Sequence, residues 1–125
     1  MSTSLNKSFF VPVQGKIAAP FDASHLGIIV ETKADATVSA LATGLVIYAG
    51  QREDTGFTVI VQHADKLQSV YGWIDKSYVQ QSDWIKGGEA IGKVAQDKRK
   101  DVGTLYFAVM KDKEFINPLD VVRFD

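Results

Sequence analysis

The stretch from Val59 to Ile74 constrains the fold most, and it reads VIVQHADKLQSVYGWI. Its first part is rich in β-branched residues, and its second part alternates aromatic with small or aliphatic residues, so both parts favour β-strands. The polar connection Ala64–Leu67 has the length of a hairpin loop. Because side chains two residues apart share one face of a strand, we expect Ser69, Tyr71 and Trp73 to lie together. The stretch therefore predicts a β-hairpin.

Composition places the chain among ordinary soluble globular proteins. Its 125 residues are 46% hydrophobic and 23% charged, which suits one domain with a substantial core. The net charge of −1 gives no electrostatic reason to bind nucleic acid or an anionic membrane. No apolar run approaches the roughly 20 residues of a membrane span, and the first residues lack the hydrophobic centre of a signal peptide. We expect a disordered lead-in over residues 1–8 and a single domain over residues 9–125.

The remaining runs also have strand character. His25–Thr32 predicts a buried strand preceded by a polar turn residue, Thr37–Ala40 and Leu45–Ala49 predict two strands around a turn, and Asp75–Tyr78 suggests a single helical turn. The predicted fold is all-β, a mostly antiparallel β-sandwich. We expect its core to contain Val38, Val46, Val59, Val61, Ile91, Leu105, Phe107 and Val109.

Several motifs at fixed spacing are more specific than any single run. They are HLGII from His25, VSALATGLVIYAG from Val38, the hairpin itself, VQQSDWIKGGEAIG from Val79, GTLYFAV from Gly103 and INP from Ile116. Together they resemble the lysostaphin-type (LytM-like) zinc endopeptidases, and the resemblance extends from Phe10 to about Leu119. It implies the duplicated hybrid-motif β-sandwich of that family.

The departures from the family pattern fall at the positions of its zinc ligands and catalytic histidines. By resemblance, His25, Ile29 and Tyr106 occupy the three zinc-ligand positions, and Trp73 and Thr104 occupy the positions of two catalytic histidines. An isoleucine has no lone pair to donate, and a catalytic zinc site needs three protein ligands. Without the metal the family mechanism has no Lewis acid. We therefore expect no metal, no cofactor and no enzyme activity.

The hairpin connection departs from the family as well. Lys66 stands where the family usually has glycine after Asp65. Glycine would permit a positive φ there. The turn is therefore either of a different type or slightly strained.

Four segments, GIIVETKAD, REDTGFTVIVQHAD, YGWID and TLYFAVMKDKEFINP, suggest a more specific role. They resemble the degenerate LytM-like domain of a membrane-anchored sporulation regulator. The resemblance implies a non-catalytic protein-binding domain in the forespore intermembrane space, on the extracytoplasmic face of a membrane. Its implied partners are an intramembrane metalloprotease, which it holds inactive, and a regulating serine protease. The alternative is a peptidoglycan-binding or glycan-binding module, in which Tyr71, Trp73 and Tyr106 could stack on sugar rings.

We expect aromatic side chains to close the former active-site groove. Trp73 and Tyr106 would pack together, with Tyr71 beside them, because aromatic groups left facing water would be unfavourable. If they instead stand open, they would anchor a partner. A closed groove would leave exposed loops such as Gln51–Gly56 or Gln96–Asp101 for partner contacts.

Overall fold

The computed structural model describes residues 9–124, so the predicted lead-in at residues 1–8 lies outside the described residues. The strands are β1 (Gly15–Ala19), β2 (Ile28–Lys33), β3 (Thr37–Ser39), β4 (Gly44–Arg52), β5 (Gly56–Gln62), β6 (Leu67–Gly72), β7 (Ile74–Ser77), β8 (Trp84–Ile85), β9 (Ala90–Asp97), β10 (Val102–Lys111) and β11 (Glu114–Ile116). A single 3-10 turn, η1 (Pro118–Asp120), is the helical structure of this range. Nothing helical in residues 9–124 has the length and hydropathy of a membrane span.

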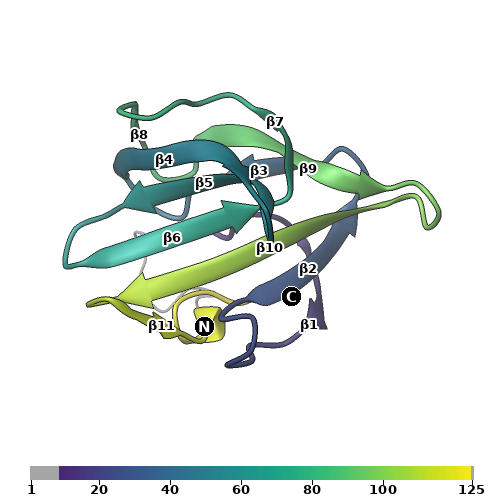
Figure 1. Ribbon diagram of the computed structural model, residues 1–125, viewed down its shortest axis with the longest axis horizontal. Coiled ribbons are helices and arrows are strands. Elements are labelled where there is room, and N and C mark those ends of the chain that lie inside the picture. The colour runs from purple at the N-terminus through teal and green to yellow at the C-terminus, as the bar shows by residue number, and fades with distance from the viewer. Residues whose placement is uncertain (1–8, 125) are drawn as a thin grey trace.

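The strands form one large antiparallel sheet with a smaller branch. The large sheet runs β1-β2-β10-β6-β5-β4-β8, and β11 pairs with the end of β10. The first part of β9 pairs with β3 and β7, and its last residues pair with β10. Figure 1 shows β7 and β9 along the upper side of the molecule, with β10 and β2 crossing below them. The predicted all-β, mostly antiparallel fold is confirmed.

The core lies between the large sheet and the branch formed by β3, β7 and β9. All eight residues predicted for the core have an exposed fraction of 0%. In β10, alternation directs Leu105, Phe107 and Val109 into this core and Tyr106 and Ala108 to the opposite face. The opposite face carries a second, smaller apolar cluster, so the large sheet is apolar on both sides. The second cluster positions the candidate site.

One predicted element has a different structure. Asp75–Tyr78 was expected as a helical turn, yet most of it belongs to β7, which pairs with β9. Ile74 lies opposite Val94 in this pairing, and both side chains are buried in the core. Burial against a neighbouring strand outweighs the weak helical preference of a four-residue segment.

The connection at the centre of the predicted hairpin is a two-residue turn. Asp65 and Lys66 have φ values of 61° and 62°, and the Leu67 amide donates to the Ala64 carbonyl at 3.3 Å. Two successive positive φ values define a type I′ turn, which suits the twist of a hairpin but favours Asn-Gly. Lys66 therefore adopts the left-handed conformation that glycine would adopt without strain.

Candidate functional site

A tight turn places His25 at the entrance of β2. The Leu26 amide donates to the Asp22 carbonyl at 2.7 Å, and the Ser24 amide donates to Asp22 Oδ1 at 2.7 Å. The bond from the Ser24 amide lowers the pKa of Asp22, because it favours the charged carboxylate. His25 is half-buried, and its Nδ1 is enclosed without a hydrogen-bond partner among the described residues.

Tyr106 lies directly across from Ile29, as its partner in the pairing of β10 with β2. Its side chain is 8% exposed, and its hydroxyl donates to the His25 carbonyl at 2.5 Å. Gly27 makes room for this ring, because a Cβ there would lie 2.8 Å from Tyr106 Cζ. Burial, and secondarily the charge of Asp54, raises the pKa of Tyr106. The hydroxyl therefore stays protonated and able to donate.

Trp73 packs against Tyr106, with their ring centroids 6.1 Å apart and their planes inclined by 59°. Its φ is 58°, an unusual value for a bulky residue. The Trp73 amide donates to the Thr55 carbonyl at 2.7 Å, and its carbonyl accepts from the Ala95 amide at 2.8 Å. The predicted common face for Tyr71 and Trp73 is wrong, because the positive φ interrupts strand alternation and brings Trp73 to the face of Tyr106.

Tyr71 does not border the groove, contrary to our expectation. Its side chain is fully buried in the main core, where its ring lies 5.5 Å from that of Phe107. Its hydroxyl lies 2.8 Å from the Leu41 amide and 2.6 Å from Ser69 Oγ. Alternation was correct for Ser69 and Tyr71, which share the core face, and this places Tyr71 on the side of the sheet opposite Trp73.

A groove of about 610 Å³ stays open beside the two packed aromatics, so the expected closure is also corrected. It is lined by Ser24, His25, Leu26, Ile29, Arg52, Asp54, Thr55, Thr58, Ile60, Val70, Trp73, Tyr106, Met110 and Phe115. Four of the five former active-site positions thus lie together. The fifth, Thr104, is not in this lining and pairs with Glu31 and Ala95 further along β10.

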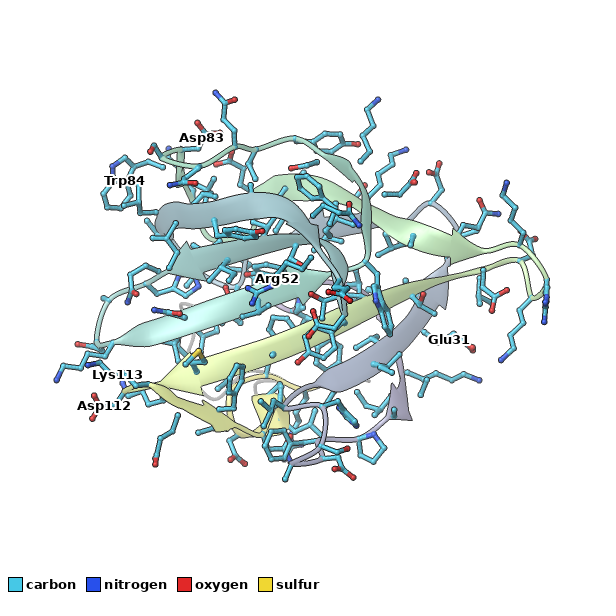
Figure 2. The ribbon with its side chains drawn as sticks, viewed as in Figure 1. Glu31, Arg52, Asp83, Trp84, Asp112 and Lys113 are labelled. Carbon is cyan, nitrogen blue, oxygen red and sulfur yellow. The ribbon has the colours of Figure 1, made fainter. Side chains whose placement is uncertain are left out.

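Several groove residues were not identified from the sequence. Met110 could have been predicted from the sequence, because strand alternation places it on the same face as Tyr106 and Ala108. Arg52 ends β4, and Thr55 lies in the turn before β5. Both belong to the segment Gln51–Gly56, which the sequence offered as an exposed loop for partner contacts and not as part of the groove. Figure 2 shows Arg52 over the front face of the large sheet, and its guanidinium lies 5.5 Å from the centre of the Tyr48 ring.

The donor set does not fit the zinc ion that the family implies. Ile29 offers no lone pair, and the Tyr106 hydroxyl is engaged with the His25 carbonyl. Only His25 keeps a family donor at these positions, and one imidazole does not make a zinc site. Within residues 9–124, no three His, Cys, Asp or Glu residues gather closely enough to hold a metal ion. The arrangement instead offers an apolar surface with polar groups at its rim, which suits binding.

Comparison with known proteins gives consistent matches. The model of Peptidase family M23 matches residues 23–118. Stage IV sporulation protein FA of Bacillus subtilis (strain 168) is 32% identical over 121 residues, which are 97% of this chain and 45% of that protein. Stage II sporulation protein Q of the same organism is 35% identical over 88 residues, which are 69% of this chain and 31% of that protein. The chain thus spans less than half the length of these curated relatives.

A solved structure supports the same architecture. A chain from the structure of the SpoIIQ-SpoIIIAH pore forming complex superimposes with a TM-score of 0.79 over 98% of this chain and 93% of that chain, at 22% identity. At this identity the likeness concerns the fold alone. The sporulation regulator that the four sequence segments resemble is stage IV sporulation protein FA, in agreement with the match across nearly the whole chain.

Proposed function

Because this chain belongs to Peptidase family M23 but keeps only one of the family's zinc donors, we propose that it is a non-catalytic protein-binding domain. The observation that carries the proposal is the pairing of Tyr106 with Ile29, where the family resemblance places two zinc ligands. The Tyr106 hydroxyl bonds to the chain at His25 and leaves no donor for a metal. Without a Lewis acid or a catalytic histidine, the peptidase mechanism has no means of activating water.

The open groove is the proposed binding surface. Its floor is apolar, with Ile60, Val70 and Met110 among its residues, and Arg52 and Asp54 supply charges of both signs. Apolar pockets with a few polar groups are typical of binding sites, and a large aromatic side chain in the wall commonly dominates binding energy. Trp73 is the residue of this kind here. The groove therefore suits an apolar side chain on a protein segment.

The more specific role follows from the relatives. The 32% identity to stage IV sporulation protein FA and the 35% identity to stage II sporulation protein Q support a place in a sporulation complex. In this proposal the domain is the extracytoplasmic part of a membrane-anchored regulator in the forespore intermembrane space. It holds an intramembrane metalloprotease inactive until a regulating serine protease cleaves it.

Co-purification from membranes tests the role. The full-length protein that carries this domain would be tagged and compared with its Trp73→Ala variant. We expect wild type to retain the metalloprotease complex and Trp73→Ala to reduce the recovered complex by about tenfold or more, as for loss of an interface anchor. Trp84→Ala is the matched control, because Trp84 is 73% exposed and lies outside the groove lining.

Two outcomes would contradict the proposal. Equal recovery with both tryptophan variants would remove the groove from the interaction. Sedimentation of the domain with insoluble peptidoglycan, lost in Trp73→Ala, together with no retained membrane protease, would favour the glycan-binding alternative.

A further inference from the structure

A row of side chains crosses the outer face of the large sheet, at the end next to the β5–β6 turn. The pairing register aligns one residue from each of six neighbouring strands, β8, β4, β5, β6, β10 and β11. In that order they are Trp84, Leu45, Gln62, Gln68, Met110 and Phe115. Directly paired residues point to the same face of a sheet, so we call these six the cross-sheet row. Figure 2 shows Trp84 at the upper left, with the turn Asp112–Lys113, which leads into β11, below it.

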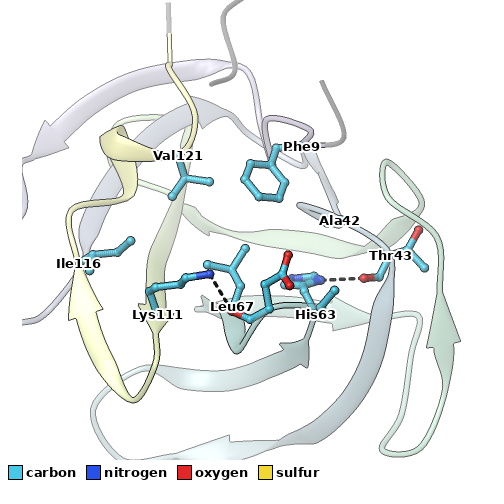
Figure 3. A pocket seen from close by; sticks show the side chains of 10 residues that line it. Phe9, Ala42, Thr43, His63, Leu67, Lys111, Ile116 and Val121 are labelled. Atoms are coloured by element: carbon cyan, nitrogen blue, oxygen red, sulfur yellow. Dashed lines mark hydrogen bonds between the residues drawn. The ribbon is translucent and has the colours of Figure 1, made fainter. Parts of the chain in front are cut away.

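The chain neighbours of the two glutamines point to the opposite side of the sheet. His63 and Leu67 line a pocket of about 590 Å³ together with Val121 of the main core. Figure 3 shows His63 bonded to the Thr43 carbonyl in this pocket. Within the row, Trp84 is 73% exposed and the other five residues are partly exposed. The cross-sheet row is therefore an accessible surface.

The row has the same chemistry when it is read from either end. Its order is aromatic, apolar, amide, amide, apolar, aromatic, and none of its six side chains is charged. In a two-fold symmetric interface the same patch meets itself, so it must be complementary to its own reverse. The cross-sheet row meets this requirement.

We propose that the cross-sheet row is the contact surface of a two-fold symmetric dimer, with a second copy of this chain as the partner. An axis parallel to the strands, between β5 and β6, reverses the row. Trp84 of one copy then faces Phe115 of the other, Leu45 faces Met110, and the glutamines face each other at the centre. The two sheets pack face to face, which is a common arrangement of β-sheets.

The two glutamines have the hydrogen-bonding capacity that this arrangement needs. Gln68 Nε2 donates to Gln62 Oε1 at 2.7 Å. Gln62 Nε2 donates to the His63 carbonyl at 3.1 Å and to the Leu67 carbonyl at 3.4 Å. An amide nitrogen has two hydrogens and an amide oxygen has two lone pairs. Gln68 Nε2 thus keeps one hydrogen and Gln62 Oε1 one lone pair, and the axis brings these groups opposite each other twice.

The turn beside the row supplies complementary charges. Asp65 and Lys66 join β5 to β6, so they lie close to the proposed axis. Reversal of the hairpin brings Lys66 of one copy beside Asp65 of the other. Complementary charges at the rim of an interface favour the correct register and faster association.

The size of the row predicts a weak dimer. Six strands at a spacing of about 4.8 Å make the row about 24 Å long. With Ile60 and Val70, the next outward residues along β5 and β6, each copy contributes roughly 300 Å², below the roughly 800 Å² per partner of a stable complex. We expect a dissociation constant of the order of 0.1 mM. Met110 and Phe115 also border the groove, but the dimer depends on this chain alone.

Sedimentation equilibrium from about 10 µM to about 1 mM tests the dimer. We expect the dimer fraction of wild type to rise over this range. Leu45→Glu should raise the dissociation constant by about tenfold or more, because it places a carboxylate opposite Met110. Tyr78→Glu is the matched control, because Tyr78 is 45% exposed and lies outside the row. A wild-type chain that stays monomeric throughout, or equal effects of the two variants, would overturn the proposal.

Disulfide cross-linking tests the orientation of the two copies. The chain has no cysteine, so Leu45→Cys and Met110→Cys each introduce a single thiol. In the proposed dimer the two residues face each other, and sheets packed in this way can be joined by a disulfide. Two copies of Leu45→Cys would hold their thiols about 14 Å apart, three strand spacings, too far for a bond.

We therefore expect covalent dimers when the two cysteine variants are mixed and few with either alone, with the linked peptides identified by mass spectrometry. Cross-linking of Leu45→Cys alone as readily as the mixture would overturn the reversed arrangement. Absence of cross-linking in the mixture at about 1 mM would overturn it as well.

Discussion

The positive φ of Trp73 determines that its indole lines the groove. A positive φ is costly for a large side chain, of the order of 1–3 kcal/mol. Here the angle is maintained by hydrogen bonds on both sides of the residue, to Thr55 and Ala95. The conformation turns the indole away from the main core and onto Tyr106, at the wall of the groove. The strain is therefore found where the proposed binding surface needs its aromatic residue.

Stability measurements can separate the two tryptophans. Trp73→Ala should lower the free energy of unfolding by about 1–3 kcal/mol, less than for a fully buried tryptophan because Trp73 is only partly buried. Trp84→Ala should change it by less than about 0.5 kcal/mol, since Trp84 is largely in solvent. Denaturant unfolding of both variants provides the comparison. Equal effects would contradict the packing described for Trp73.

At this scale the sequence predicted which residues lie together better than the direction of each side chain. His25, Ile29, Trp73 and Tyr106 do line one groove. Strand alternation assigned Tyr71 to that groove, because nothing in the sequence marks the positive φ two residues later. The closeness of Tyr106 to Gly27 could not be predicted either, since Tyr106 lies in β10 and Gly27 lies just before β2, far away in the chain.

Two hairpin turns each place two consecutive non-glycine residues at positive φ. The β5–β6 turn contains Asp65 and Lys66, and the β10–β11 turn contains Asp112 and Lys113, with all four residues at positive φ. Neither turn has the glycine that this geometry favours. Lys66 Nζ and Asp112 Oδ1 lie 3.7 Å apart, but both side chains are well exposed and such pairs contribute little. The turns are therefore maintained by the strands that they connect.

Substitution in these turns tests the assignment. Lys66→Gly should raise the free energy of unfolding by about 0.5–1 kcal/mol, because glycine adopts a positive φ without strain. Lys76→Gly, in β7 and without a positive φ, is the matched control and should destabilise by a similar amount. Thermal unfolding of both variants provides the measurement. Destabilisation by Lys66→Gly would show that the turn differs from the one described.

The strands themselves were largely predictable, because β-branched runs and alternation are local signals. The assignment failed at β7, where a short polar segment is a strand only through its pairing with β9. The division of β9 between the branch and the large sheet was equally beyond a local pattern, since it depends on strands from three other parts of the chain.

At the scale of the molecule, β10 explains how the family fold can persist when residues at the family's zinc-ligand positions differ. β10 pairs with β2, β6, β9 and β11, and one of its faces forms the core while the other faces the groove. A change at Tyr106 therefore leaves Leu105, Phe107 and Val109 in place. The same separation made the fold and core predictable from the sequence, whereas the shape of the open groove depends on side chains from several strands.

Zinc analysis of the purified domain tests the central claim, that the metal site is lost while its scaffold remains. Ile29 and Tyr106 face each other across β2 and β10, and Tyr106 reaches His25. We predict no stoichiometric zinc in wild type, and one bound equivalent in the double variant Ile29→Asp/Tyr106→His, lost again when His25→Ala is added. Tightly held zinc in the wild-type domain at one equivalent, lost on His25→Ala, would contradict the account.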